Sequence, residues 1–249
     1  MLDVDSYKLE STVSDLIDQR LSYTLQISFP AVILSCFFGL VWGLYAGQKS
    51  GLAAERASSA LNVLVNSVPV FAIGLILIIL FCFKLKLFPY MGLNSSDIGS
   101  GAFAYFADRI KHLILPVATL VIAELPSRYL LIKNLAADEM NSKYVLYARQ
   151  RGLSERVIRY RYILPNITGP LINMIGLSVA SSVGGSLVVE NLFSVKGMGT
   201  LLTDALHSLD YPLMQGILFV CTFIMVIAIV LSDVLCIISD PMLRKGGKR

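Results

Sequence analysis

Ionisable residues that stand inside apolar stretches are the first candidates for chemistry in this sequence. Glu124 and Arg128 interrupt a long apolar run and are four positions apart, so on a helix they face the same side as an ion pair. Glu190 ends another apolar run. A charged side chain inside a membrane can bind a polar solute or join two helices, and the sequence leaves both roles open.

Uncharged polar residues also occur inside the apolar runs. Asn62 and Asn66 lie in the first half of one run, and Ser181 lies in another that is rich in small residues. At such depth a polar group faces protein or water rather than lipid. For the run with the asparagines, hydrogen bonding between helices is the first interpretation, and contact with a transported solute is the second. The run with Ser181 can line the pathway or a subunit interface, and the sequence leaves both open.

No arrangement of catalytic or metal-binding residues is recognisable. The sequence has no Walker A motif, no dinucleotide-binding glycine motif and no zinc-protease motif. His112 and His207 are far apart, and the four cysteines lack the spacing of metal ligands. We therefore expect no catalytic residue, no metal site and no cofactor bound by this chain. An intramembrane enzyme and a stand-alone secondary transporter stay as alternatives of other classes, although no internal repeat is visible.

The composition requires a lipid environment. Of the 249 residues 55% are apolar and only 15% are charged, and the mean hydropathy is +0.70. A soluble domain carries about 25% charged residues. We predict an all-α membrane protein with about five transmembrane helices, at residues 21–47, 57–83, 113–135, 172–189 and 213–238. Residues 1–20 are polar, and we expect them to form an interfacial segment before a transmembrane domain of residues 21–249.

The placement of lysine and arginine predicts the orientation in the membrane. With the N-terminus outside, fourteen of the 21 cations lie on the inner side. We therefore expect a multi-pass protein of the cytoplasmic membrane with an outer N-terminus and a cytoplasmic C-terminus. Residues 84–112 and 192–212 are then outer loops. The net charge of +4 comes from this loop bias, and we expect no nucleic-acid partner.

The inner loop at residues 136–170 carries more local structure than a plain connection. Within residues 141–170, six cations stand against a single acid, Glu155. Gly152 ends a first helical segment, because glycine accepts backbone angles that other residues avoid. Ser154 can cap a second segment with Glu155 behind it. We therefore predict two short helices that are joined at Gly152 and lie on the membrane face.

This loop resembles the cytoplasmic coupling loop of ABC importer permeases. Ala148, Gly152 and Ile163–Pro165 have the spacing of that loop. The glutamate that most members carry before this alanine is absent, as is typical of the dipeptide, oligopeptide and nickel branch. Further runs resemble the first of the two paired permeases in that branch: Val188–Phe193, Gly197–Gly199, Asp210–Pro212, Gln215–Gly216 and Asp240–Pro241 with Arg244. Members of this type begin with an additional spanning helix ahead of the part that is similar here.

The resemblance implies the type I permease fold and an ATP-driven importer. The partners it implies are a second related permease, two ATPase subunits that bind ATP and Mg²⁺, and an extracytoplasmic substrate-binding protein. Peptides are the first substrate class it suggests, and nickel or a metal chelate is the second. The residues expected to contact the ATPase are Tyr144, Tyr147, Ala148, Arg151, Gly152, Leu153 and Ser154. The candidates for the transport pathway are Asn62, Asn66, Glu124, Arg128, Ser181 and Glu190.

Overall fold

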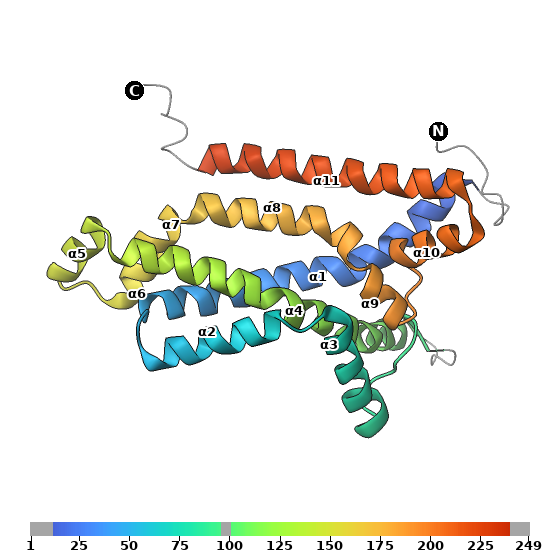
Figure 1. Ribbon diagram of the computed structural model, residues 1–249, viewed down its shortest axis with the longest axis horizontal. Coiled ribbons are helices and arrows are strands. Elements are labelled where there is room, and N and C mark those ends of the chain that lie inside the picture. Colours follow the sequence, from blue (N-terminus) through green and yellow to red (C-terminus); the bar gives the residue numbers. More distant parts are fainter. Residues whose placement is uncertain (1–11, 96–100, 240–249) are drawn as a thin grey trace. The chain divides into compact units, whose positions relative to one another are not determined.

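A computed structural model describes residues 12–95 and 101–239, and its regular elements are helices (Figure 1). In chain order they are α1 (Val13–Gln48), α2 (Ala53–Asn66), α3 (Val70–Leu77), η1 (Ile78–Lys84), α4 (Ala102–Met140), α5 (Lys143–Gln150), α6 (Glu155–Ile158), η2 (Arg159–Ile163), α7 (Leu164–Asn166), α8 (Thr168–Gly185), α9 (Leu187–Leu192), α10 (Met198–Ser208) and α11 (Tyr211–Ser239). The segments η1 and η2 are π-helical.

Three helices within the described residues are long and apolar enough to cross a membrane, namely α1, α4 and α11. Two bent pairs also qualify if each pair counts as one span: α2 with α3–η1, and α6–α7 with α8. Five spans result on that count, so the expected all-α membrane architecture is confirmed. The first break falls at Ser67–Pro69, where proline cannot donate the hydrogen bond that would continue the helix. The second break falls at Ile167.

Helical structure extends beyond the predicted spans. Residues 13–20 form the first turns of α1, because Val13 and Ile17 are buried against apolar side chains of α10 and α11. Residues 102–112, expected in an outer loop, are the beginning of α4. The other expected outer loop contains α10, whose buried face includes Leu201 and Ala205. The predicted features at residues 1–11 and 240–249, Asp240–Pro241 and Arg244 among them, lie outside the described residues.

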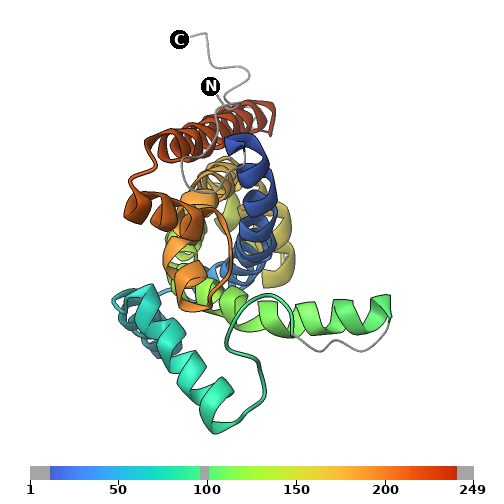
Figure 2. The ribbon, with the colours of Figure 1, turned by 90° about the vertical axis from the view of Figure 1, so that its right-hand side faces the viewer.

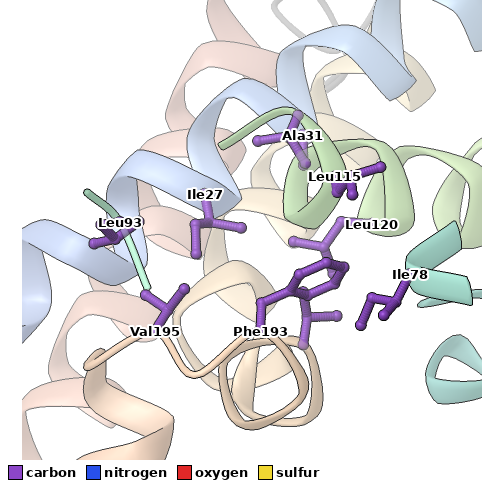
Figure 3. Packing of buried hydrophobic residues seen from close by; sticks show 10 residues of the cluster. Ile27, Ala31, Ile78, Leu93, Leu115, Leu120, Phe193 and Val195 are labelled. Atoms are coloured by element: carbon purple, nitrogen blue, oxygen red, sulfur yellow. The ribbon is translucent and has the colours of Figure 1, made fainter. Parts of the chain in front are cut away.

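The chain divides into two compact units, and α1, α4, α8 and α11 contribute to both. Unit 1 comprises residues 1–32, 69–121 and 179–227. Its main core joins α1, η1, α4 and the segment after α9, and Figure 3 shows Phe193 together with Leu120 and Ile78 in this core. In Figure 2, α9 and α10 are the two short orange helices that precede α11. Unit 1 thereby contains the segments that surround Glu190.

Unit 2 comprises residues 33–68, 122–178 and 228–249, and it depends on close contact between α1 and α4. Gly39, Gly43 and Gly47 recur every fourth residue on α1 and face α4. A Cβ atom added at Gly43 would lie 2.8 Å from the Cβ atom of Ile132, closer than side chains tolerate. Small residues at this spacing let two membrane helices approach until their backbones nearly touch.

Candidate functional site

The loop after α4 folds into two short helices joined by a tight turn. Gly152 has a φ of +74° and follows the last turn of α5. Its N–H donates to the carbonyl of Arg149 at 2.9 Å, and the N–H of Leu153 donates to the carbonyl of Ala148 at 3.2 Å. This pair of bonds is the Schellman motif, which satisfies the terminal carbonyls of a helix. Ser154 then caps α6, because its Oγ accepts from the N–H of Val157 at 3.4 Å.

Buried apolar residues hold this loop to the rest of unit 2. Val145 and Ala148 of α5 share one core with Ile158, Ile163 and neighbouring residues of α1 and α4. Figure 1 shows α5 and α6 beyond one end of α4. A short helix fixed in this way moves with the helices beneath it and does not swing as a free loop.

The seven residues expected to contact the ATPase divide into two groups. Tyr147, Arg151, Gly152 and Ser154 are exposed. Ala148 is buried, and Tyr144 and Leu153 are half-buried against the core of unit 2. Leu146 was not among the expected residues, yet it is 54% exposed beside Tyr147, which is 62% exposed. Leu146 directly follows Val145, and consecutive side chains on a helix point to different sides. This helical periodicity is the signal that would have indicated Leu146.

Tyr144 has a structural role on the inner side of α5. Its hydroxyl donates to the carboxylate of Glu139, in the last turn of α4. Burial, followed by the hydrogen bond to that carboxylate, raises the pKa of the Tyr144 phenol above its usual value. The phenol therefore stays neutral at physiological pH and ties α5 to α4.

A second set of polar contacts connects the loop to the end of α1. Arg149 Nε lies 2.9 Å from a carboxylate oxygen of Glu155, which pairs α5 with α6. The side-chain amide of Gln48 donates to the backbone carbonyl of Glu155 at 2.8 Å. The amide oxygen of Gln48 accepts from Arg159 Nε at 2.5 Å. Gln48 at the end of α1 therefore bonds to both α6 and η2.

The predicted ion pair on α4 is present. Arg128 and Glu124 lie 2.6 Å apart, with the Arg128 side chain 7% exposed and the Glu124 side chain 34% exposed. The Nε atom of Arg128 is buried and has no hydrogen-bond partner within the described residues. The guanidinium is therefore the buried member of the pair, and the carboxylate is the more exposed one.

Asn66 is far from this pair in the sequence but belongs to the same unit. Its side-chain oxygen accepts from the hydroxyl of Ser127 at 2.8 Å, and both residues are exposed. Ser127 was not anticipated, since a single serine in a span carries no signal of its own. Asn62 is buried and donates to the carbonyl of Ser58 in its own helix. Asn66, Ser127 and Glu124 thus form the accessible polar face of α2 and α4.

Glu190 is fully buried in unit 1 and has a different environment. One carboxylate oxygen accepts from the hydroxyls of Thr24 at 2.7 Å and Ser186 at 2.6 Å. The other accepts from the N–H groups of Gly199 at 2.7 Å and Thr200 at 3.3 Å. These N–H groups lie in the first turn of α10, the end at which a helix attracts negative charge. Glu190 therefore caps α10 and joins it to α1, and a solute cannot reach it.

Ser181, the remaining pathway candidate, is exposed on α8 and belongs to unit 1. Asn66, Glu124 and Arg128 belong to unit 2. Among the described residues, no group of three or more His, Cys, Asp or Glu side chains is placed to hold a metal ion.

Comparison with known proteins places these features in a family. Residues 39–245 match the family described as binding-protein-dependent transport system inner membrane component. The chain belongs to this family. Its two sequence signals, the loop around Gly152 and the runs after α8, both fall within the matched range.

Individual relatives agree with this assignment. The chain is 32% identical to the probable peptide ABC transporter permease protein y4tP of Sinorhizobium fredii, over 93% of this chain and 72% of that protein. It is 29% identical to the oligopeptide transport system permease protein AppB of Bacillus subtilis, over 92% and 71%. It is also 29% identical to the nickel import system permease protein NikB of Staphylococcus aureus, over 96% and 67%.

A solved structure agrees on the fold. A chain of the inward-facing MetNI methionine ABC transporter superposes with a TM-score of 0.69, at 17% identity, over 91% of this chain and 97% of that chain. The expected ABC importer permease fold is confirmed. The family member described here is the inner-membrane permease subunit of an ABC importer, a class of transporter that works with ATPase and substrate-binding partners.

Proposed function

We propose that the exposed side of α5 is the surface on which an ATPase subunit docks. Leu146 and Tyr147 present apolar area there, and Arg151 adds a cation at the end of the helix. Apolar and aromatic anchors beside an arginine are typical of the centre of a protein interface. The observation that carries the proposal is that the opposite side of α5 is held in place by the buried Val145 and Ala148 and by the Gly152 turn. A displacement of the ATPase is therefore transmitted to α4.

The proposed assembly contains this chain, a second related permease, two ATPase subunits and an extracytoplasmic substrate-binding protein. ATP and Mg²⁺ bind to the ATPase subunits, and this chain performs no catalysis. The excess of cations in the loop at residues 136–170 supports a cytoplasmic position for α5. The N-terminus is then outside and the C-terminus is cytoplasmic.

We infer that the polar face of Asn66, Ser127 and Glu124 lines the transport pathway. Hydrocarbon does not accommodate an exposed carboxylate, so this face of α4 borders water or protein. Amide and hydroxyl side chains match the donors and acceptors of a peptide backbone. Peptides are therefore the proposed substrates, and nickel or a metal chelate is the second candidate because NikB is also a relative. Uptake of a labelled tripeptide and of radioactive nickel by membrane vesicles separates the two.

The coupling proposal is tested first by the subunit composition of the purified complex and then by one substitution in this chain. A tagged chain purified in mild detergent from its native membrane should bring two ATPase subunits and a second permease, identified by mass spectrometry. Recovery of the chain alone would count against the assembly. The next step replaces Gly152 with Asp in the reconstituted complex, which places a charge on the proposed docking surface.

Gly51→Asp is the matched control. Gly51 and Gly152 both have positive φ, +88° and +74°, and a Cβ atom at either would meet nothing within 4 Å. The backbone strain of the two substitutions is therefore similar. We expect Gly152→Asp to remain in the membrane but to lose uptake while ATP hydrolysis continues, and Gly51→Asp to transport normally. Normal uptake by Gly152→Asp would refute the docking surface.

A further inference from the structure

Four side chains form a cation–aromatic cluster where α1 ends and η2 begins: Tyr45, Lys49, Arg159 and Tyr160. Lys49 Nζ lies 4.3 Å from the centre of the Tyr45 ring. The guanidinium carbon of Arg159 lies 5.1 Å from the same ring and 5.9 Å from the ring of Tyr160. Cations stacked on aromatic faces in this way hold each other's positions.

This cluster fixes the depth of η2 in the membrane. Tyr45 stands at the end of the uncharged run at residues 21–47, where tyrosine prefers the boundary between hydrocarbon and water. Arg159 contacts the rings of Tyr45 and Tyr160, so the preference of Tyr45 for this boundary predicts headgroup depth for η2 as well. The helical segment at residues 155–166 is also bent by 66° from the helix at residues 168–182, so it does not continue that helix along the same axis.

Two arginines flank Arg159 and Tyr160 in the sequence of this segment. Arg156 and Arg161 are exposed, as is Tyr160. Within the part of the chain that the structure describes, neither arginine has an ion pair or a hydrogen bond to another side chain. Glu155, the only acid at residues 141–170, is already paired with Arg149. The segment therefore presents positive charge at headgroup depth with no acid of its own to neutralise it.

We propose that Arg156, Tyr160 and Arg161 bind the phosphodiester headgroup of an anionic phospholipid. Guanidinium groups form paired hydrogen bonds with phosphate oxygens, and a tyrosine hydroxyl can add a third donor. The predicted headgroup depth favours lipid as the partner of these three residues. The exposed apolar residues that a protein partner needs, Leu146 and Tyr147, lie on α5 instead. The inference goes beyond the transport role and requires only that the chain is embedded in a membrane.

The test titrates the purified chain, with whatever subunits accompany it, with phosphatidylglycerol and with phosphatidylcholine, and counts bound lipids by native mass spectrometry. The variant is Arg156→Gln with Arg161→Gln. The matched control is Arg56→Gln with Lys143→Gln, which removes the same charge from exposed positions outside the proposed docking surface. We expect the variant to lose phosphatidylglycerol affinity by about fivefold for each cation removed, and the control to keep it. Binding of phosphatidylcholine should not change.

Three results would overturn the proposal. Equal losses in variant and control would mean that the loop attracts anions by net charge alone. Unchanged phosphatidylglycerol binding in the variant would exclude these arginines as ligands. Loss of ATPase co-purification without loss of lipid would make this face a protein interface. The variant with Lys at both positions keeps the charge but loses the paired guanidinium bonds, so it should bind phosphatidylglycerol more tightly than the Gln variant and less tightly than the wild type. It provides the reading if the Gln variant is poorly folded.

Discussion

Arg149 of α5 and Glu155 of α6 form an ion pair of 2.9 Å across the turn at Gly152. Their side chains are 41% and 54% exposed, so water screens much of the attraction. Pairs of this kind contribute about 0–1 kcal/mol. The stiffness of the loop therefore comes from the backbone turn and from the apolar residues beneath it.

The first prediction concerns that ion pair. A double-mutant cycle with Arg149→Gln and Glu155→Gln should give a coupling free energy below about 1 kcal/mol. Thermal unfolding of the purified complex measures it. A larger coupling would mean that the pair is shielded by a partner subunit, which would itself locate an interface.

The second prediction separates the two sides of the loop. Ile158→Ala removes a fully buried side chain and should cost about 2–5 kcal/mol of unfolding free energy. Leu146→Ala removes an exposed one and should change stability by less than about 0.5 kcal/mol, while uptake driven by ATP falls. Unfolding midpoints and uptake rates of the two variants provide the comparison. Full uptake by Leu146→Ala would count against its place in the docking surface.

Local patterns in this region were readable from the sequence because their partners are close along the chain. The Gly152 turn, the Ser154 cap and the Glu124–Arg128 pair each involve residues at most five positions apart, and all three are confirmed. The recurrence of glycine at 39, 43 and 47 is a local pattern of the same kind. It marks the approach of α1 to α4.

Other features depended on residues far apart in the chain. The hydrogen bond between Ser127 and Asn66 joins positions 61 apart, and the one between Thr24 and Glu190 joins positions 166 apart. No local periodicity indicates such partners. The segment at residues 192–212 reads as a loop for the same reason, since α10 is held by the Glu190 cap and by contacts with α1 and α11.

The third prediction concerns the membrane ion pair. Glu124→Gln leaves the buried guanidinium of Arg128 without a counterion and should cost about 3 kcal/mol. Glu124→Gln combined with Arg128→Met removes both charges and should recover most of the stability. If Glu124 lines the pathway, the double variant is folded but transports more slowly. Wild-type uptake by that folded variant would limit the pair to a structural role.

The fourth prediction concerns the cap of α10. Glu190→Gln puts an NH₂ group where an oxygen accepts hydrogen bonds, and it should destabilise the fold by about 2–3 kcal/mol. The exposed Glu155→Gln serves as the control and should leave the unfolding midpoint unchanged. An equally small effect at Glu190 would show that its second carboxylate oxygen is not needed as a hydrogen-bond acceptor.

The fifth prediction concerns the contact of α1 with α4. Gly43→Val forces methyl groups into Ile132 and should remove most of the folded protein from the membrane. Val41→Leu enlarges an exposed position on the same helix and should be tolerated. Size-exclusion profiles of fluorescent fusions compare the two. Equal recovery would mean that the helices can separate without loss of the fold.

The hydrogen bond from Thr24 to Glu190 also sets an order of events during synthesis. Thr24 leaves the ribosome 166 residues before Glu190 does. At about 5–20 residues per second, the first helix waits roughly 10–30 seconds for its partner. During that interval the Thr24 hydroxyl faces lipid, water or an insertion factor. The packing of unit 1 is therefore completed only after most of the chain has entered the membrane. A nascent chain that stalls before α10 lacks the contacts between α1, Glu190 and α10.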